Sequence, residues 1–284
     1  MIYVHSTGSL NRLQNEELDV KAAWKVVSAK MIRRTDRFIQ LALLGAHSAV
    51  REQKLAKNTA LYMASGQGNL AVFKRLRDQR YIHKQPPKPV DFINSLSNTS
   101  GFYVAQFLGI EGKNLNVSRL GFVAETLLLL AQNDLELHKE SQVLLGGVDE
   151  LQEPVEFTRR TLGLCDERPL GEGSNWLLLS AEAKGAVAGL KVLKETMDLA
   201  ELMVYLQHVA PNVSLAFGQR CEPAVKESIL KARASDQVVF TCIYDFYESA
   251  SLHLMNQFIE NSNGSLCFIE TYNHKFRVVE IQNL

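Results

Sequence analysis

The sequence lacks any closely spaced pair of cysteines. Its four cysteines are far apart and form no CxxC motif, and 284 residues are too many for a mini-domain held together by disulfides. They are Cys165, Cys221, Cys242 and Cys267. A reducing compartment is therefore expected, and we predict a cytoplasmic protein that needs no metal and no cofactor.

An excess of charge and a long apolar run are also missing. Thirty-one basic and 31 acidic residues give a formal net charge of zero, which gives no support to a nucleic-acid or membrane-surface role. The longest apolar run, Leu120 to Ala131, includes Glu125 and is shorter than the roughly 20 residues of a membrane span. No secretory leader pattern opens the chain. We expect a soluble protein that does not insert into a membrane.

A phosphate-binding loop is not well supported either. The apolar segment TALYMA, residues 59–64, runs into SGQGN, but neither the GK[ST] of a P-loop nor a third glycine follows. A plain strand-to-helix turn is the better interpretation. With 46% hydrophobic and 22% charged residues, the composition is typical of a globular chain of one large or two small domains.

A strand–helix–strand unit stands at the centre of what is present. The strand-like NLNVSR enters the apolar helical run LGFVAETLLLLAQ, and SQVLLGG closes the unit. In an α/β enzyme the bend between the first strand and the helix is a common place for a nucleophile. Here the bend offers Arg119, Leu120, Gly121 and Phe122, none of which is a good nucleophile.

The remaining chain alternates strand and helix patterns. We predict a short strand at 2–4 that breaks at Gly8, two helices within 18–44, and a helix capped near 98–100 whose apolar face includes Phe102. Further on we predict a glycine turn at 168–174, strands at 175–180, 213–217 and 238–243, helices at 184–209 and 248–260, and a closing hairpin of 266–272 with 276–281. This order predicts a layered α/β fold with an added antiparallel hairpin.

Three segments in this order resemble the β-ketoacyl synthases of the thiolase fold. They are PVDFINSLSNTSGFYVAQFLGIEGKNLNVSR, VLLGGVDE and RPLGEGSNWLLLS, and they most resemble the chain-length-factor type of ketosynthase-like subunit. The resemblance implies a thiolase-like layered α/β/α/β/α fold. It implies one domain over 1–284, with an N-terminal half of 1–155 and a shortened C-terminal half of 156–284.

The resemblance also locates the family's catalytic positions. Ketosynthases use a cysteine at the strand-to-helix bend and two histidines, and these positions fall on Gly121, Phe217 and, less directly, Tyr247. Cys242 falls near a family lysine, and His253 is expected to be a core or surface residue. The family's glycine-rich loop near the C-terminus is replaced by ETYNHKFR. A remade active site built on Glu125, Asp149 or Glu172 remains an alternative.

The leading functional hypothesis is a non-catalytic, chain-length-factor type subunit. It would form a heterodimer with an active ketosynthase and shape its acyl tunnel in polyketide, aryl polyene or fatty-acid-like biosynthesis, meeting acyl carrier protein indirectly. Two alternatives remain. One is an acyl-transfer or decarboxylating enzyme that acts on carrier-bound thioesters, and the other is a stand-alone homodimer.

Three sets of residues receive expected roles from the resemblance. The strand of Asn114, Leu115, Asn116, Val117, Ser118 and Arg119 would pair across a two-fold axis, with Leu115 and Val117 packed inward and the polar side meeting the partner. Candidate tunnel gates are Phe92, Ile93, Phe102 and Tyr103. Within the basic run from Lys74 to Lys88, Arg77, Arg80 and Lys84 are candidates for docking an acidic carrier protein. The alternative is that this run is an ordinary solvated face, and that the aromatic residues belong to the core.

Overall fold

The computed structural model describes residues 1–28, 34–51, 53–96, 98–233 and 238–284. Within them one continuous mixed sheet has the strand order β3-β2-β4-β5-β1-β6-β9-β8-β7. The strands are β1 (Ile2–Arg12), β2 (Ala60–Ser65), β3 (Asn114–Ser118), β4 (Gln142–Asp149), β5 (Glu172–Ser180), β6 (Ala188–Val192), β7 (Ser214–Phe217), β8 (Ser265–Tyr272) and β9 (Lys275–Asn283).

The helices are α1 (Val20–Val27), α2 (Arg37–Val50), α3 (Leu70–Arg77), the π-helix η1 (Asp78–Ile82), α4 (Pro89–Asn94), α5 (Thr99–Leu108), α6 (Val123–Glu136), α7 (Val155–Thr161), α8 (Leu199–Gln207), α9 (Pro223–Ala232) and α10 (Ser251–Asn261).

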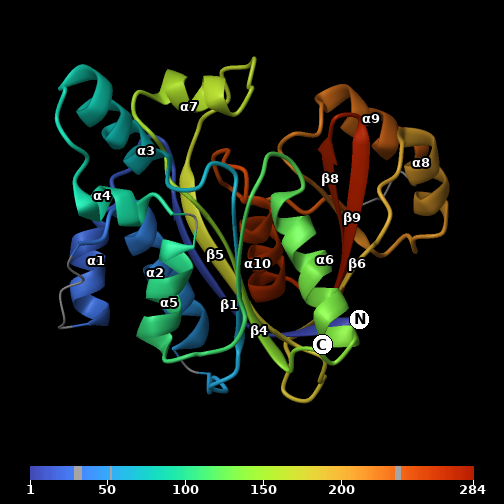
Figure 1. Ribbon diagram of the computed structural model, residues 1–284. Coiled ribbons are helices and arrows are strands. Elements are labelled where there is room, and N and C mark those ends of the chain that lie inside the picture. The colour runs from blue at the N-terminus through green and yellow to red at the C-terminus, as the bar shows by residue number, and fades with distance from the viewer. Residues whose placement is uncertain (29–33, 52, 97, 234–237) are drawn as a thin grey trace.

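Five layers result from the packing of these elements (Figure 1). Helices α6 and α10 lie between the two halves of the sheet, where their apolar residues meet strands of both halves in the central core. Helices α1, α2 and α5 cover the outer face of β3-β2-β4-β5-β1, and α8 and α9 cover the outer face of β6-β9-β8-β7. This is the layered α/β/α/β/α architecture that the sequence predicts.

The central strand–helix–strand unit is confirmed. β2 is parallel to both β3 and β4, so the chain crosses over through α6, whose face with Leu127 and Leu128 is buried. The predicted closing hairpin is also confirmed. Its two-residue turn, Asn273 and His274, has φ values of +50° and +58°, which match the twist of the flanking strands.

Several predictions of local structure are wrong. The strand at 2–4 continues to Arg12, and the last three residues of the expected glycine turn at 168–174 are the buried start of β5. The expected helix at 184–209 contains β6, because pairing with β1 and β9 satisfies its backbone. No strand forms over 238–243, where Val239 makes an isolated bridge to Leu215, and helix α9 was not predicted.

Among the described residues, no helix combines the length and the apolar composition that a membrane span requires.

Candidate functional site

The turn from β3 into α6 has a left-handed backbone at two successive residues. Gly121 has a φ of +66°, and Phe122, which immediately precedes the helix, has a φ of +48°. A Cβ in this region costs about 1–2 kcal/mol, whereas glycine enters it freely. The backbone of this turn therefore favours the glycine at position 121.

The ring of Tyr272 fills the space that a side chain at position 121 would need. A Cβ built on Gly121 would lie 2.0 Å from Cγ and 2.4 Å from both Cδ atoms of Tyr272. Tyr272 ends β8, and its ring also packs edge-to-face on Phe122, with the ring centroids 6.3 Å apart. The guanidinium of Arg220 lies 5.4 Å from the centroid of the Tyr272 ring. Position 121 therefore has no room for a cysteine nucleophile.

Three carboxyl groups gather behind this turn. Glu248 accepts a hydrogen bond from the backbone N–H of Gly121 at 3.3 Å and forms an ion pair with Arg220. Glu270 accepts from the backbone N–H of Thr271, and a Cβ on Gly218 would lie 2.1 Å from its two oxygens. Glu125 projects from the first turn of α6 and is 1% exposed.

Burial controls the protonation of two of these groups. It raises the pKa of Glu270 well above its ordinary value, and the neighbouring charges of Glu125 and Glu248 raise it further. Burial also raises the pKa of Glu125, against the opposing effects of the Ser251 hydroxyl and the Arg277 guanidinium. Neither oxygen of Glu125 has a hydrogen bond of normal geometry within the described residues. Glu125 and Glu270 therefore tend to retain protons that ordinary glutamates lose.

The cavity enclosed by this cluster is very small. Phe122, Tyr244, Ser251 and Glu270 are among its lining residues, and it offers about 10 Å³ to the centre of a water molecule, which is room for one. An acyl thioester does not fit there. Tyr272 also borders an open hollow of about 310 Å³ on the outer side of the β8–β9 hairpin.

Asp149 holds the ends of two strands and the start of α10 together. Its carboxylate accepts hydrogen bonds from the Ser65 hydroxyl (2.9 Å), the Gly66 N–H (2.8 Å), and the N–H and hydroxyl of Ser249 (2.8 and 2.7 Å). Burial raises the pKa of Asp149 to about 6, although each of these bonds favours the charged form. With its oxygens occupied in this way, Asp149 acts as a structural tie.

Phe217 and Tyr247, the two positions that the resemblance assigns to family histidines, are both buried. Phe217 is buried in the outer core beneath α8 and α9. The buried hydroxyl of Tyr247 donates to the Asn11 Oδ1 and accepts from the Asn175 Nδ2 at 2.7 Å. Burial raises its pKa well above the ordinary value, so it remains a neutral phenol.

Cys242 and His253 lie near this region without forming a nucleophile–base pair in the described contacts. Burial raises the pKa of the Cys242 thiol to about 11, so it is protonated at neutral pH. His253 is buried on α10, its Nδ1 lies 2.7 Å from the Asn11 Nδ2, and burial lowers its pKa. The surroundings of both residues therefore favour a role in packing over a role in catalysis.

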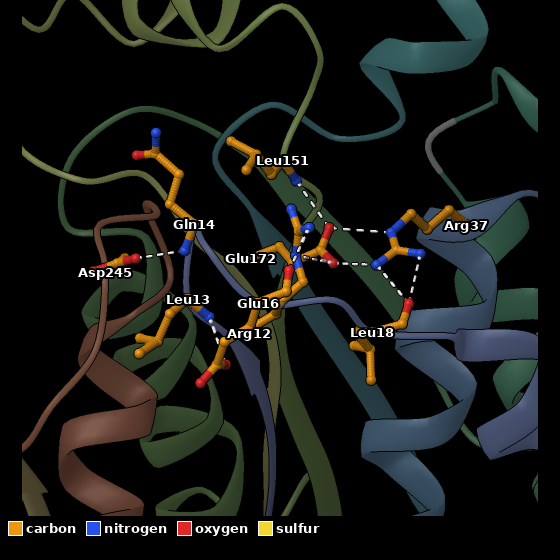
Figure 2. Close-up of polar contacts among 9 residues, drawn as sticks. All are labelled: Arg12, Leu13, Gln14, Glu16, Leu18, Arg37, Leu151, Glu172 and Asp245. Carbon is orange, nitrogen blue, oxygen red and sulfur yellow. Dashed lines mark hydrogen bonds and ion pairs between the residues drawn. The ribbon is translucent and has the colours of Figure 1, made fainter.

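Glu172, from the glycine–glutamate–glycine segment, lies in a different polar cluster (Figure 2). It is fully buried and forms ion pairs with Arg12 (3.0 Å) and Arg37, and it accepts from the Leu151 N–H at 3.2 Å. Arg37 also donates to the Leu18 carbonyl oxygen. The cluster joins β1, α2 and β5. Glu125, Asp149 and Glu172 are thus held by three separate sets of partners rather than facing one cleft.

The chain is similar to known proteins in its structure and not in its sequence. No family model and no curated protein matches the sequence. The chain superposes on the ishigamide ketosynthase/chain length factor with a TM-score of 0.77 and 13% identity over 100% of this chain and 99% of that one. For a β-ketoacyl synthase from Burkholderia phymatum STM815, the TM-score is 0.68 and the identity 12%, over 100% of this chain and 99% of that one. For a chain from the complex of the ketosynthase ApeO with its chain length factor ApeC from Xenorhabdus doucetiae, the TM-score is 0.57 and the identity 13%, over 98% of this chain and 98% of that one.

The chain has the thiolase-like fold of the ketosynthases. At the turn between β3 and α6, Gly121 lies beneath Tyr272, with buried carboxyl groups behind them. No group of three or more histidine, cysteine or acidic side chains in the described part of the chain has an arrangement suited to a metal ion.

The predicted pairing strand lies at the sheet edge. β3 comes first in the strand order, so one of its backbone edges faces away from β2. Leu115 and Val117 pack against the central core, as predicted. Asn116 and Ser118 border a small cavity within the chain, and Ser118 is exposed, so the expectation that the polar side meets a partner stays a prediction. Arg119 follows the strand and donates to the Thr126 hydroxyl at 2.9 Å.

The candidate gate residues are mostly exposed. Phe92, Ile93 and Phe102 have 61%, 52% and 57% of their surface accessible, which overturns the alternative that they are core residues. Tyr103 is half-buried against the outer core and packs edge-to-face on Phe102. α4 and α5 carry these side chains, and α5 contacts β3. An apolar surface therefore adjoins the open strand edge, which is a common property of protein interfaces.

The basic run forms part of α3, η1 and the following loop. Arg80 and Lys84 are exposed there, whereas Arg77 forms an ion pair with Asp78 at 2.8 Å. Of the three docking candidates, Arg80 and Lys84 are therefore the two whose charge is most available to a partner.

Proposed function

We propose that this chain is a non-catalytic ketosynthase-like subunit of the chain-length-factor type. In this proposal it forms a heterodimer with an active β-ketoacyl carrier-protein synthase in the cytoplasm and shapes that enzyme's acyl tunnel. The observation that carries the proposal is the Tyr272 ring in the space above Gly121, because it leaves no room for the acyl-accepting side chain of a ketosynthase.

The exposed surface supports the partner part of the proposal. Phe102 lies on α5, which contacts the edge strand β3, and Phe92 and Ile93 lie on α4, which packs on α5. The exposed side chains offer apolar area, and the open edge of β3 offers backbone hydrogen-bonding groups, to a second subunit. Two of the similar structures are described as containing a chain length factor. Carrier protein would meet the complex near Arg80 and Lys84. An aryl polyene or related polyketide would be the product of the complex.

The alternative is an acyl-transfer or decarboxylating enzyme with a remade site. Glu125 and Glu270 have the raised pKa values that a general acid needs. The cavity lined by Glu270 has room for about one water molecule, so this alternative has less support.

Mass spectrometry of acyl transfer tests the proposal. The chain is incubated with an acyl-loaded carrier protein, alone and together with a ketosynthase encoded beside it. We expect no acyl adduct on this chain in either sample, and an adduct on the ketosynthase cysteine in the second. A thioester on Cys165, Cys221, Cys242 or Cys267 that turns over would contradict the proposal.

A further inference from the structure

The open edge of β3 presents its backbone polar groups at known positions. β3 is first in the strand order, so one of its edges has no neighbouring strand in the described sheet. On the other edge, the Leu61 N–H donates to the Lys113 carbonyl oxygen at 2.7 Å, and the Arg119 N–H donates to the Ser65 carbonyl oxygen at 3.1 Å. Residues 113, 115, 117 and 119 therefore face β2, and residues 114, 116 and 118 are the ones that a further strand would bond.

A basic residue stands at each end of this edge. Lys113 and Arg119 are both exposed. Because side chains alternate along a strand, they share one face of β3 with Leu115 and Val117, which pack against the central core. The two charges are therefore six residues apart on the same face, one before and one after the strand.

Neither charge is fully balanced within the chain. The Lys113 Nζ donates to the Asp134 carboxylate at 2.6 Å, but the Lys139 Nζ lies 3.9 Å from the same carboxylate, so two ammonium groups face one negative charge. Arg119 donates to the hydroxyl of Thr126 at 2.9 Å, which is a neutral acceptor. Both ends of the edge therefore carry an excess of positive charge.

The apolar surface beside this edge offers little other charge. Helix α5 contains no charged residue. The charged residues between positions 89 and 119 are Asp91, Glu111, Lys113 and Arg119. Asp91 is 8% exposed and pairs with Arg75 at 3.2 Å, and Glu111 pairs with Lys57 at 3.0 Å. Lys113 and Arg119 therefore dominate the electrostatic character of this surface.

Symmetry determines what these two residues would meet in a pair of identical chains. Use of the β3 edge as a dimer interface is taken from the proposed function. Two copies related by a two-fold axis would place their β3 strands antiparallel, and full overlap of residues 114–118 puts Asn116 on the axis. Lys113 of each copy then lies opposite Arg119 of the other. Side chains directly opposite each other on one face of an antiparallel pair are neighbours, and like charges there oppose pairing.

We infer that Lys113 and Arg119 disfavour pairing between two copies of this chain and select a partner strand that carries acidic side chains at the two opposing positions. Such a strand would form an ion pair at each end of the shared edge. The apolar side chains of α4 and α5 attract an identical and a different subunit alike, so the terminal charges supply the discrimination.

Charge reversal on the isolated full chain tests the repulsion. Arg119→Glu would turn both like-charged pairs of a homodimer into ion pairs, so we expect the dissociation constant for self-association to fall by roughly tenfold or more at low salt. Analytical ultracentrifugation measures it. Arg119→Gln removes the charge without reversing it and should give an intermediate value. Because Arg119 is exposed, both variants should fold as the parent does, which circular dichroism checks.

Two further variants locate the effect. Arg80→Glu makes the same change in net charge at an exposed site away from the edge, and it should self-associate as the parent does. Lys113→Gln, added to Arg119→Glu, removes the opposing cation and should reverse most of the gain. The inference is overturned if Arg119→Glu associates no more tightly than Arg80→Glu, or if its gain survives the addition of Lys113→Gln.

Binding to the neighbouring ketosynthase tests the acidic partner. Arg119→Glu should weaken the heterodimer by roughly tenfold at low salt, whereas Arg80→Glu should bind as the parent does. Unchanged binding of Arg119→Glu would overturn the assignment of an acidic partner strand. A parent chain that does not bind the ketosynthase at all would contradict the proposed function instead, and the self-association measurements, made without the ketosynthase, would still decide whether the edge charges act.

Discussion

Tyr272 occupies the position that any side chain on Gly121 would take, with its Cγ 2.0 Å from the place of a Cβ. The two residues come from different halves of the chain, one at the start of α6 and the other at the end of β8. Together they close the turn between β3 and α6, where the proposed function expects the position of a ketosynthase nucleophile.

Alanine at position 121 should therefore cost more stability than alanine at an open left-handed glycine. Gly109→Ala is the control, because Gly109 has a φ of +69° and nothing within 4 Å of its Cβ position. We expect Gly109→Ala to cost about 1–2 kcal/mol for the backbone and Gly121→Ala about 1–3 kcal/mol more for the clash. Urea unfolding measures both.

A double variant separates the clash from the backbone strain. Adding Tyr272→Ala to Gly121→Ala should make the second substitution less costly than it is in the parent chain. Strictly additive costs would mean that the two residues do not interfere and would contradict the closed-bend account.

Truncation of the exposed face should change products more than stability. Phe92→Ala and Phe102→Ala remove side chains that are more than half exposed, so each should alter the free energy of unfolding by only about 0.5 kcal/mol. In the complex, at least one should lengthen the products, as chromatography of extracts would detect. Phe73→Ala, on α3 and 53% exposed, is the control. Unchanged products in all three would reject the gate role.

Charge reversal tests the route of the carrier protein. Arg80→Glu with Lys84→Glu should slow association of the carrier protein with the complex by roughly tenfold at low salt and less at high salt, because both effects are electrostatic. Stopped-flow measurements at several salt concentrations would detect this. Lys231→Glu on α9, an exposed charge outside the run, should have little effect. If the association rate changes neither with the charge reversal nor with salt, the run is an ordinary solvated face.

Buried Glu125 should make stability depend on pH in a definite direction. Its pKa is raised in the folded chain, so the folded state holds a proton that the unfolded state releases above its ordinary value of about 4.5. The contribution is fully present below that pH and is lost as pH rises through the folded-state pKa. Glu125→Gln should therefore match the parent in acid and exceed it by about 1–3 kcal/mol in mild alkali.

Denaturant unfolding across pH measures this difference. The exposed Glu156→Gln serves as the control and should follow the parent at every pH. A Glu125→Gln variant that loses stability as pH rises as steeply as the parent does would show that Glu125 is not responsible.

Local sequence patterns predicted the parts of the fold that depend on neighbours along the chain. The unit from Asn114 to Asp149 has clear strand and helix periods, and the closing hairpin has a polar two-residue turn. β6 was missed because its pairing with β1 and β9 overrides a helical pattern. The absence of catalytic groups at Gly121, Phe217 and Tyr247 came from the resemblance alone and stays a prediction. The ring of Tyr272 above Gly121 is a tertiary contact that no sequence period encodes.

Hydrogen-bond directions within the sheet identify the best strand variant for testing the partner. The Arg119 N–H donates to the Ser65 carbonyl oxygen, and the Leu61 N–H to the Lys113 carbonyl oxygen, so alternate residues from 113 to 119 face β2. Val117 therefore turns its N–H inward, whereas Ser118 directs its N–H to the open edge. Ser118→Pro removes an edge donor with little loss inside the chain.

The most direct test of the account is the mass of the complex measured by size-exclusion chromatography with light scattering. After co-expression with the neighbouring ketosynthase, we expect a one-to-one heterodimer for the parent and for Ser118→Ala, and separate subunits for Ser118→Pro. A parent chain that elutes as a monomer and does not bind the ketosynthase would contradict the account.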